Sequence, residues 1–166
     1  MRYNINNPLA PAVLQGKGVY RWPFHEYVKE ACRMVAMPEK VIENIRAMNT
    51  VVVTTVSDAG VPNAVPVASI VVRDPETILI GDNFFKKTAE NAKKANCNVA
   101  VTSWIGREGY QVKGTGNYVT DGPDYETIKQ VIKAMNPNLP AKGCIVMKVT
   151  DVFDVAPGPN AGNKIA

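Results

Sequence analysis

The chain has 166 residues and a formal net charge of +4, with 46% hydrophobic and 20% charged residues. This length and balance suit one globular domain with a buried core. The sequence holds one histidine, His25, and three cysteines that lie far apart, Cys32, Cys97 and Cys144. These counts exclude a zinc site built of several histidines and a CxxC redox motif.

The cysteine pattern and the start of the chain both indicate a cytoplasmic protein. Three cysteines without a framework spacing favour a reducing compartment. The first residues, MRYNINNPLAP, hold Asn and Pro where a signal peptide needs an apolar stretch. No apolar run is long enough for a membrane helix. We therefore expect a soluble cytoplasmic protein with no membrane partner.

The N-terminal quarter of the chain is predicted to be an arm followed by short helices. Residues 1–22 are rich in Asn, Pro and Gly and show no hydrophobic period, which is typical of an extended arm. Apolar residues then recur at spacings of three and four from Pro23 to Val35, and again after Pro38. This spacing indicates two short amphipathic helices, each with a proline at its start.

After Thr50 the sequence changes to β-branched runs separated by turn residues. Pro66 lies inside one run, where its missing N–H predicts a sheet edge or a bulge. A helix at 86–96 and another that begins at 121–123 interrupt the strands, and the apolar period of the second predicts that Met135 faces the core. Together these elements predict a mainly β (β+α) fold, a small six-stranded antiparallel barrel with flanking short helices and a loose tail from Ala156. The predicted strands are 51–56, 62–72, 77–80, 99–104, 110–120 and 143–155.

One segment concentrates positive charge where a predicted strand runs into a helix. Residues 84–97 contain four lysines and a single acid, Glu90. Unpaired backbone N–H groups at a helix start attract anions, so Lys86, Lys87 and Thr88 are a candidate phosphate site. A solvated helix face gives the same pattern, and the residues alone leave both interpretations open.

The remaining side chains form no self-sufficient catalytic or metal site. Gly114 and Gly116 lack the third glycine of a dinucleotide fingerprint and lie in a predicted strand, which favours a bulge. His25 lies beside an apolar helix stripe and is interpreted as structural or exposed. Trp104 precedes a glycine turn, where an aromatic ring covers a core or an interface, or borders a flat ligand. An enzyme of this composition would take its chemistry from a cofactor.

Three segments, in this order along the chain, carry a resemblance to a known family. They are VVVTTVSDAGVPNAVPVAS (51–69), ILIGDNFFKKTAENAKKANCNVAV (78–101) and GYQVKGTGNYVTDGPDYE (109–126). The chain from 46 to 155 resembles the FMN-binding split-barrel family, which includes the pyridoxamine 5'-phosphate oxidase-like proteins and small bacterial FMN-binding proteins. The resemblance implies a split β-barrel domain at 46–155, flanked by the arm at 1–45 and a tail at 156–166. It also implies a homodimer that holds FMN in the groove between its subunits.

The same resemblance implies where FMN is held. The strand at 65–69 would lay its backbone along the flavin ring, and the strand end at 80–82 would contact the ring and the ribityl chain. Gly81 would let the main chain approach the flat ligand. The lysine segment would bind the phosphate, and an aromatic residue would close the site. The implied cofactor-binding residues are Val65, Pro66, Val67, Ala68, Ser69, Ile80, Gly81, Asp82, Lys86, Lys87, Thr88, Asn91 and Trp104.

The family likeness favours an FMN-binding flavoprotein, an oxidoreductase or electron carrier with an unidentified redox partner and no catalytic side chain. The oxidase proper has a C-terminal aromatic and Arg-containing segment for its pyridoxine substrate, whereas this chain ends APGPNAGNKIA. We therefore do not expect vitamin B6 oxidation. The arm would pack at the dimer edge or over the flavin, through Tyr20, Trp22 and Phe24.

Two other interpretations stay open at this level. A small barrel with a basic helix and strand aromatics is also typical of a module that binds single-stranded nucleic acid. Only 7% of the residues are aromatic and the lysines cluster on one helix, which counts against that interpretation. Some relatives within the same fold hold a deazaflavin or haem in place of FMN.

Overall fold

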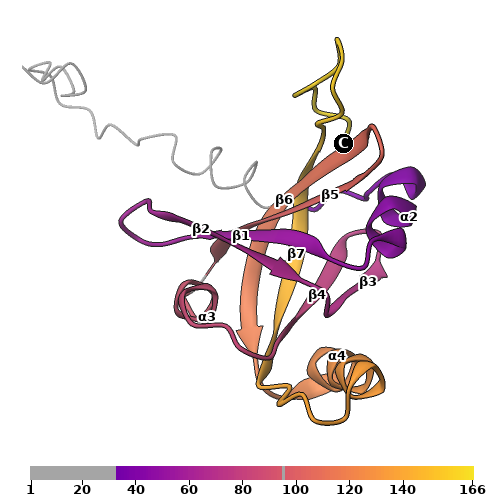
Figure 1. Ribbon diagram of the computed structural model, residues 1–166. Coiled ribbons are helices and arrows are strands. Elements are labelled where there is room, and N and C mark those ends of the chain that lie inside the picture. The colour runs from indigo at the N-terminus through magenta and orange to yellow at the C-terminus, as the bar shows by residue number, and fades with distance from the viewer. Residues whose placement is uncertain (1–32, 95) are drawn as a thin grey trace, which may run out of the picture.

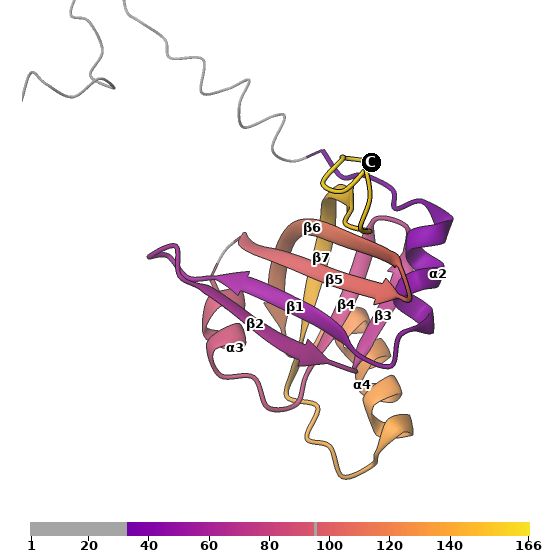
Figure 2. The ribbon, with the colours of Figure 1, turned by 45° about the horizontal axis from the view of Figure 1, so that its top comes forward.

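The computed structural model describes residues 33–94 and 96–166. One antiparallel sheet forms the body, with strand order β2-β1-β5-β6-β7-β4-β3. The sheet curls on itself, so that β1, β2 and β5 lie opposite β3 and β4 (Figures 1 and 2). The elements are α2 (Glu39–Ala47), β1 (Val51–Val56), β2 (Pro62–Val67), β3 (Ile70–Asp74), β4 (Thr77–Asp82), α3 (Lys87–Ala92), β5 (Cys97–Ile105), β6 (Glu108–Val119), α4 (Gly122–Met135) and β7 (Gly143–Asp154).

The mainly β, antiparallel split-barrel fold is confirmed, but the sheet has seven strands rather than six. The run at 62–72 was predicted as one strand, and it breaks at Ala68 and Ser69 into β2 and β3. The carbonyl of Ala68 accepts a hydrogen bond from the N–H of Ile70 at 3.1 Å, which turns the chain. As a result β2 and β3 lie at the two opposite edges of the sheet. The predicted edge position of Pro66, in β2, is confirmed.

The barrel core is built from alternating strand residues and closed by α2. Val51 and Val53 of β1 are fully buried, and Val41 and Ile45 of α2 belong to the same cluster. The strand β4 is buried along its whole length, because Ile78 and Ile80 face this core while Leu79 packs against α4. Burial on both sides fixes the end of β4, from which the candidate site extends.

One predicted helix is longer than the observed one. The helix predicted at 86–96 is the six-residue α3, because the chain leaves helical geometry and Asn96 takes a positive φ of 55° before β5. The predicted start of α4 is confirmed, with Pro123 in its first turn. Met135, at its end, was expected in the core but is 52% exposed. The bulge expected near Gly114 is confirmed by a register shift between β6 and β7.

The sequence predicted a loose tail at 156–166, and this prediction is wrong. The strand β4 pairs with β7 only as far as Lys148, which leaves one side of the second half of β7 open. The tail returns to this side, where the N–H of Ile165 bonds to the carbonyl of Val152 at 2.8 Å. Ile165 and Ala166 also pack against the barrel core. The end of the chain is therefore held by hydrogen bonds to the open edge of β7 and by the packing of Ile165 and Ala166.

Some expectations fall on residues outside the described ranges. Residues 1–32 are among them and hold most of the predicted arm at 1–45, with His25, Tyr20, Trp22 and Phe24, so the predicted packing of the arm stays a prediction. The proposed domain limits also stay predictions. Within the described part of the chain, none of the helices has the length and apolar character needed to cross a membrane.

Candidate functional site

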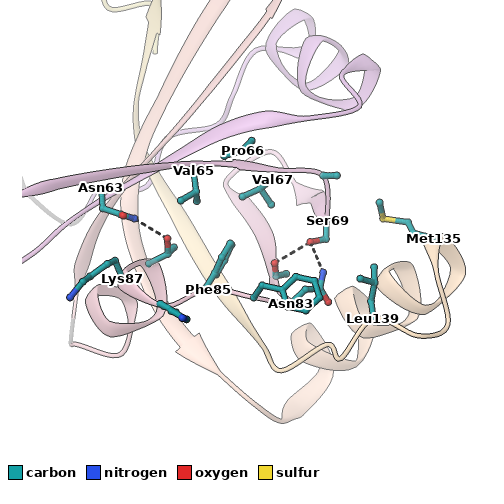
Figure 3. A pocket seen from close by; sticks show the side chains of 15 residues that line it. Asn63, Val65, Pro66, Val67, Ser69, Asn83, Phe85, Lys87, Met135 and Leu139 are labelled. Atoms are coloured by element: carbon teal, nitrogen blue, oxygen red, sulfur yellow. Dashed lines mark hydrogen bonds between the residues drawn. The ribbon is translucent and has the colours of Figure 1, made fainter.

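A cavity of about 570 Å³ opens between the edge strand β2, the end of β4 and the C-terminal end of α4. Figure 3 shows side chains from these elements pointing into the same space. The cavity brings together nine of the thirteen residues predicted to bind a cofactor. These are Val65, Pro66, Val67, Ala68, Ser69, Gly81, Lys86, Lys87 and Thr88.

The cavity is polar at one end and apolar at the other. Lys87 and Asn63 lie at the end formed by α3, and Met135 and Leu139 lie at the opposite end (Figure 3). Among the described residues, the wall contains lysines but no carboxylate, histidine, cysteine or tyrosine. A ligand with an anionic end and an apolar body therefore matches its two ends.

Polar side chains tie the short helix α3 to the hairpin of β1 and β2. The amide of Asn63 donates to the Thr88 hydroxyl oxygen at 2.9 Å, and the amide of Asn91 donates to the Thr55 hydroxyl oxygen at 3.0 Å. Thr88 and Asn91 are both buried. The bond from Asn63 leaves the hydroxyl proton of Thr88 free to be donated to a ligand at the cavity wall.

Asp82 anchors the turn that carries the lysine segment to the cavity. It is only 2% exposed, and its carboxylate accepts hydrogen bonds from the N–H of Phe85 at 2.8 Å and the hydroxyl of Tyr118 at 2.7 Å. Burial raises the pKa of Tyr118, and the hydrogen bond to Asp82 raises this pKa further. The phenol therefore remains a donor at neutral pH. Asp82 does not line the cavity but fixes the backbone that leads to Lys86.

Ser69 and Gly81 join the two strand segments of the cavity wall. The Ser69 hydroxyl donates to the carbonyl of Gly81 at 3.0 Å, and the N–H of Gly81 donates to the carbonyl of Ser69 at 2.8 Å. The amide of Asn83 reaches the Ser69 hydroxyl at 3.4 Å. A Cβ at position 81 would lie 2.6 Å from Cδ1 of Ile132, so the packing of α4 already requires glycine here, whatever a ligand requires.

Four predicted residues do not line the cavity: Ile80, Asp82, Asn91 and Trp104. Ile80 is buried in the barrel core and Asn91 holds α3 in place. Trp104 is 49% exposed and lies in a separate shallow groove at the turn between β5 and β6. A role for Trp104 at a site shared by two subunits stays a prediction.

The sequence interpretation missed six residues of the cavity wall. Phe84 and Phe85 are adjacent to the lysine segment, and the 71% exposure of Phe84 marks it as a surface aromatic that periodicity could not reveal. Met135 follows the apolar period of α4, which placed it in the core. The residues missed are Asn63, Asn83, Phe84, Phe85, Met135 and Leu139.

In the ranges 33–94 and 96–166, no group of three or more His, Cys, Asp or Glu side chains is arranged to hold a metal ion. Residues 37–156 match the family model for pyridoxamine 5'-phosphate oxidase. The chain belongs to the pyridoxamine 5'-phosphate oxidase-like, split-barrel family. The match includes α2 and ends just beyond β7.

Similar proteins agree with this assignment. The chain is 35% identical over 136 residues to the uncharacterised protein MJ0282 of Methanocaldococcus jannaschii, an alignment that covers 80% of this chain and 90% of that protein. HupZ of Group A Streptococcus superposes with a TM-score of 0.65 at 23% identity, over 76% of this chain and 99% of that one. An FMN-binding protein of Syntrophomonas wolfei gives a TM-score of 0.63 at 19% identity, over 81% and 92%. At these identities the two structures show a shared fold.

Proposed function

We propose that the chain is an FMN-binding flavoprotein that acts as an oxidoreductase or an electron carrier. The observation that carries this proposal is the amphipathic cavity of about 570 Å³, which lies within the usual range of small-molecule sites. Its cationic end and its apolar end are the two environments that a phosphate and a flat aromatic ring require. Membership of the split-barrel family supports the same cofactor.

The α3 end of the cavity fits the phosphate. The ammonium groups of Lys86 and Lys87 and the hydroxyl of Thr88 would supply charge-assisted and neutral hydrogen bonds to phosphate oxygens. The side chains that tie α3 to the sheet, Asn63 and Asn91, hold this donor set in place before a ligand arrives. Preorganised donors of this kind lose little freedom on binding.

The opposite part of the cavity fits the flavin ring. Ala68 and Ser69 line the wall, and within the described chain their backbone N–H groups donate to no protein acceptor. These groups are available to carbonyl and nitrogen atoms of a ring. Met135 and Leu139 supply apolar surface at the far end.

The chain supplies binding and orientation rather than acid–base chemistry. FMN, when bound, supplies hydride or electron transfer at its ring. In the part of the chain that the structure describes, no carboxylate, histidine, cysteine or tyrosine lines the cavity wall. The wall residues therefore fix the ring, hold the phosphate and exclude water from the apolar end.

We further propose that the protein is a homodimer whose partner subunit covers the outer face of β1 and β5. Val56 and Trp104 are exposed apolar residues at outward-facing positions of these strands, which favours their burial against a second copy. Because Trp104 lies in a separate groove from the cavity, it would close the FMN site only across such an interface. A monomer in light scattering with FMN bound would contradict this arrangement.

The visible absorption spectrum of the purified protein tests the proposed cofactor. We expect the two bands of an oxidised flavin, and a rise in the thermal midpoint when FMN is added. Saturation at 100 times the dissociation constant should stabilise the fold by about 2.7 kcal/mol. If the spectrum is that of a haem or a deazaflavin, the proposed cofactor is that group and not FMN. A colourless protein whose midpoint does not respond to FMN would refute the proposal.

A further inference from the structure

A second cavity of about 360 Å³ adjoins the proposed FMN cavity. Most of the residues that line it belong to the C-terminal end of α2 and to the edge strand β3, two elements that lie side by side in Figure 2. Ala68 and Met135 line both cavities. The two cavities are therefore neighbours that share part of their walls. A molecule in the second cavity would lie beside whatever occupies the first.

The second cavity contains one charged group, the guanidinium of Arg46. The Arg46 side chain is 59% exposed, and its ion pair with Glu39 is long, at 3.8 Å. An exposed pair of this length contributes little and leaves most of the guanidinium N–H donors available. Among the residues that the structure describes, neither cavity is lined by a carboxylate. The two cavities therefore have positive charge from Lys86 and Lys87 at the start of α3 and from Arg46 on α2, although Lys87 also forms an exposed ion pair with Glu90.

Apart from Arg46 and Asn49, the side chains that line this second cavity are apolar. They include Met48, which follows α2, and Ile70 and Val71 of β3. The sulfur of Met48 accepts a hydrogen bond from the N–H of Trp104 at 2.9 Å, which holds the wall at the end of α2. An apolar body with a single anionic group matches this lining.

We propose that this second cavity, the Arg46 groove, binds a small organic carboxylate with an apolar body next to the bound flavin. A planar guanidinium matches a carboxylate through two parallel hydrogen bonds. A single cation also balances a monoanion, whereas the doubly negative phosphate is matched by the two lysines at the other end. The Arg46 groove rests on the proposed FMN function, because its position beside the ring gives it a role as the substrate subsite.

Benzoate and its neutral, nearly isosteric analogue benzamide test the groove in the FMN-loaded protein. FMN affinity is measured first, by quenching of flavin fluorescence. Each probe is then titrated while the visible flavin bands are followed, because a ligand beside the ring perturbs them. We expect saturable perturbation by benzoate and binding of benzamide that is weaker by about tenfold, the difference that one charge-assisted contact makes.

Two variants at Arg46 and one control separate the groove from general charge effects. Arg46→Gln should abolish the preference for benzoate while FMN affinity stays unchanged, and Arg46→Lys should keep part of the preference. Lys40→Gln removes a charge from the same helix, where Lys40 lies over the ring of Tyr110 away from the groove, and should change neither affinity. Equal benzoate binding by the wild type and Arg46→Gln would overturn the proposal that the Arg46 groove binds a carboxylate.

The outcomes also separate the two proposals. A protein that binds FMN but shows no benzoate effect, or releases FMN as benzoate binds, refutes the Arg46 groove alone. A protein that binds no FMN refutes the proposed function, and the groove as its substrate subsite falls with it.

Discussion

The α3 wall and the α4 wall of the cavity differ in what holds them to the sheet. The α3 wall is a six-residue helix fixed by bonds between polar side chains, chiefly those of Thr88 and Asn91. The α4 wall is a fourteen-residue helix whose Ile128 and Ile132 are fully buried against Leu79. A helix as short as α3 is not stable alone, so its position depends on those few bonds and on the packing of the small side chains of Ala89 and Ala92.

Because of this difference, we expect one wall of the cavity to contribute mainly to the stability of the fold and the other mainly to FMN binding. Apolar burial at α4 contributes to the stability of the whole domain. The polar bonds at α3 mainly decide where Lys86, Lys87 and Thr88 lie. We therefore expect substitutions at the α4 wall to change chiefly the free energy of unfolding, and those at the α3 wall to change chiefly FMN affinity.

The largest expected effect is on FMN affinity in the double variant Lys86→Ala, Lys87→Ala. Each charge-assisted contact to the phosphate is worth about 1.5–3 kcal/mol, so affinity should fall by about a hundredfold or more. Stability without FMN should change little, because both side chains lie at the surface. Fluorescence titration measures the affinity, with Lys40→Ala, Lys129→Ala as a control of equal charge. Unchanged affinity would place the phosphate elsewhere.

The next effect is on stability at the α4 wall. Ile132→Ala should lower the free energy of unfolding by about 2–5 kcal/mol, because it leaves a cavity behind Gly81. Urea unfolding measures the loss, and FMN affinity of the folded fraction should stay within a few fold of the wild type. If the Ala variant does not fold, Ile132→Val should cost about 0.5–1.5 kcal/mol. A loss of FMN affinity without a loss of stability would contradict the expectation that the α4 wall acts mainly on stability.

A smaller effect is expected where α3 meets β1. Asn91→Ala leaves the buried hydroxyl of Thr55 without its donor, which should cost about 1–3 kcal/mol of stability and also weaken FMN binding. Replacing both partners, Asn91→Leu with Thr55→Val, should restore much of the stability but not the affinity. A double-mutant cycle by urea unfolding and FMN titration measures both. Equal recovery of the two quantities would mean that Asn91 has no role in placing the lysines.

The smallest effect concerns pH and the polar link between β3 and α4. Arg73 bonds to Asp74 and to Asp124 of α4. Burial opposes ionisation of Asp74, but hydrogen bonds, first from Arg73, lower its pKa below the usual 3.8. The stabilisation is therefore complete above that value and is lost as the pH falls through the lowered pKa. Because the pair is partly exposed, Asp74→Asn should remove less than about 1 kcal/mol of this acid-dependent stability. Urea midpoints of the wild type and Asp74→Asn that change identically between pH 5 and pH 2.5 would contradict a stabilising role of the Arg73–Asp74 pair.

Most strands could be predicted because each is a run of β-branched residues with turn residues at its ends. The break between β2 and β3 could not, since residues 62–72 favour extended structure throughout. What divides them is tertiary: the chain crosses from one edge of the sheet to the other at Ala68 and Ser69. The folded-back tail was missed for a similar reason, because the open side of β7 to which it bonds exists only once β4 has paired with the first half of β7.

The candidate site was predicted where its residues are close in sequence. The lysine segment and the stretch at 65–69 each formed a recognisable pattern. Met135 and Leu139 join them only through the fold, and Met135 carried the misleading signal of a helix period. Periodicity identifies the buried face of a helix, but it does not show where that face extends beyond the core to a cavity.

The central claim, that Lys86, Lys87 and Thr88 hold the phosphate of a bound flavin, is tested most directly with a ligand that lacks the phosphate. The dissociation constants of FMN and riboflavin for the wild-type protein are measured by fluorescence quenching under one set of conditions. We predict that FMN binds about a hundredfold more tightly or better, because two charge-assisted contacts distinguish the ligands. Equal affinity for FMN and riboflavin would contradict the account.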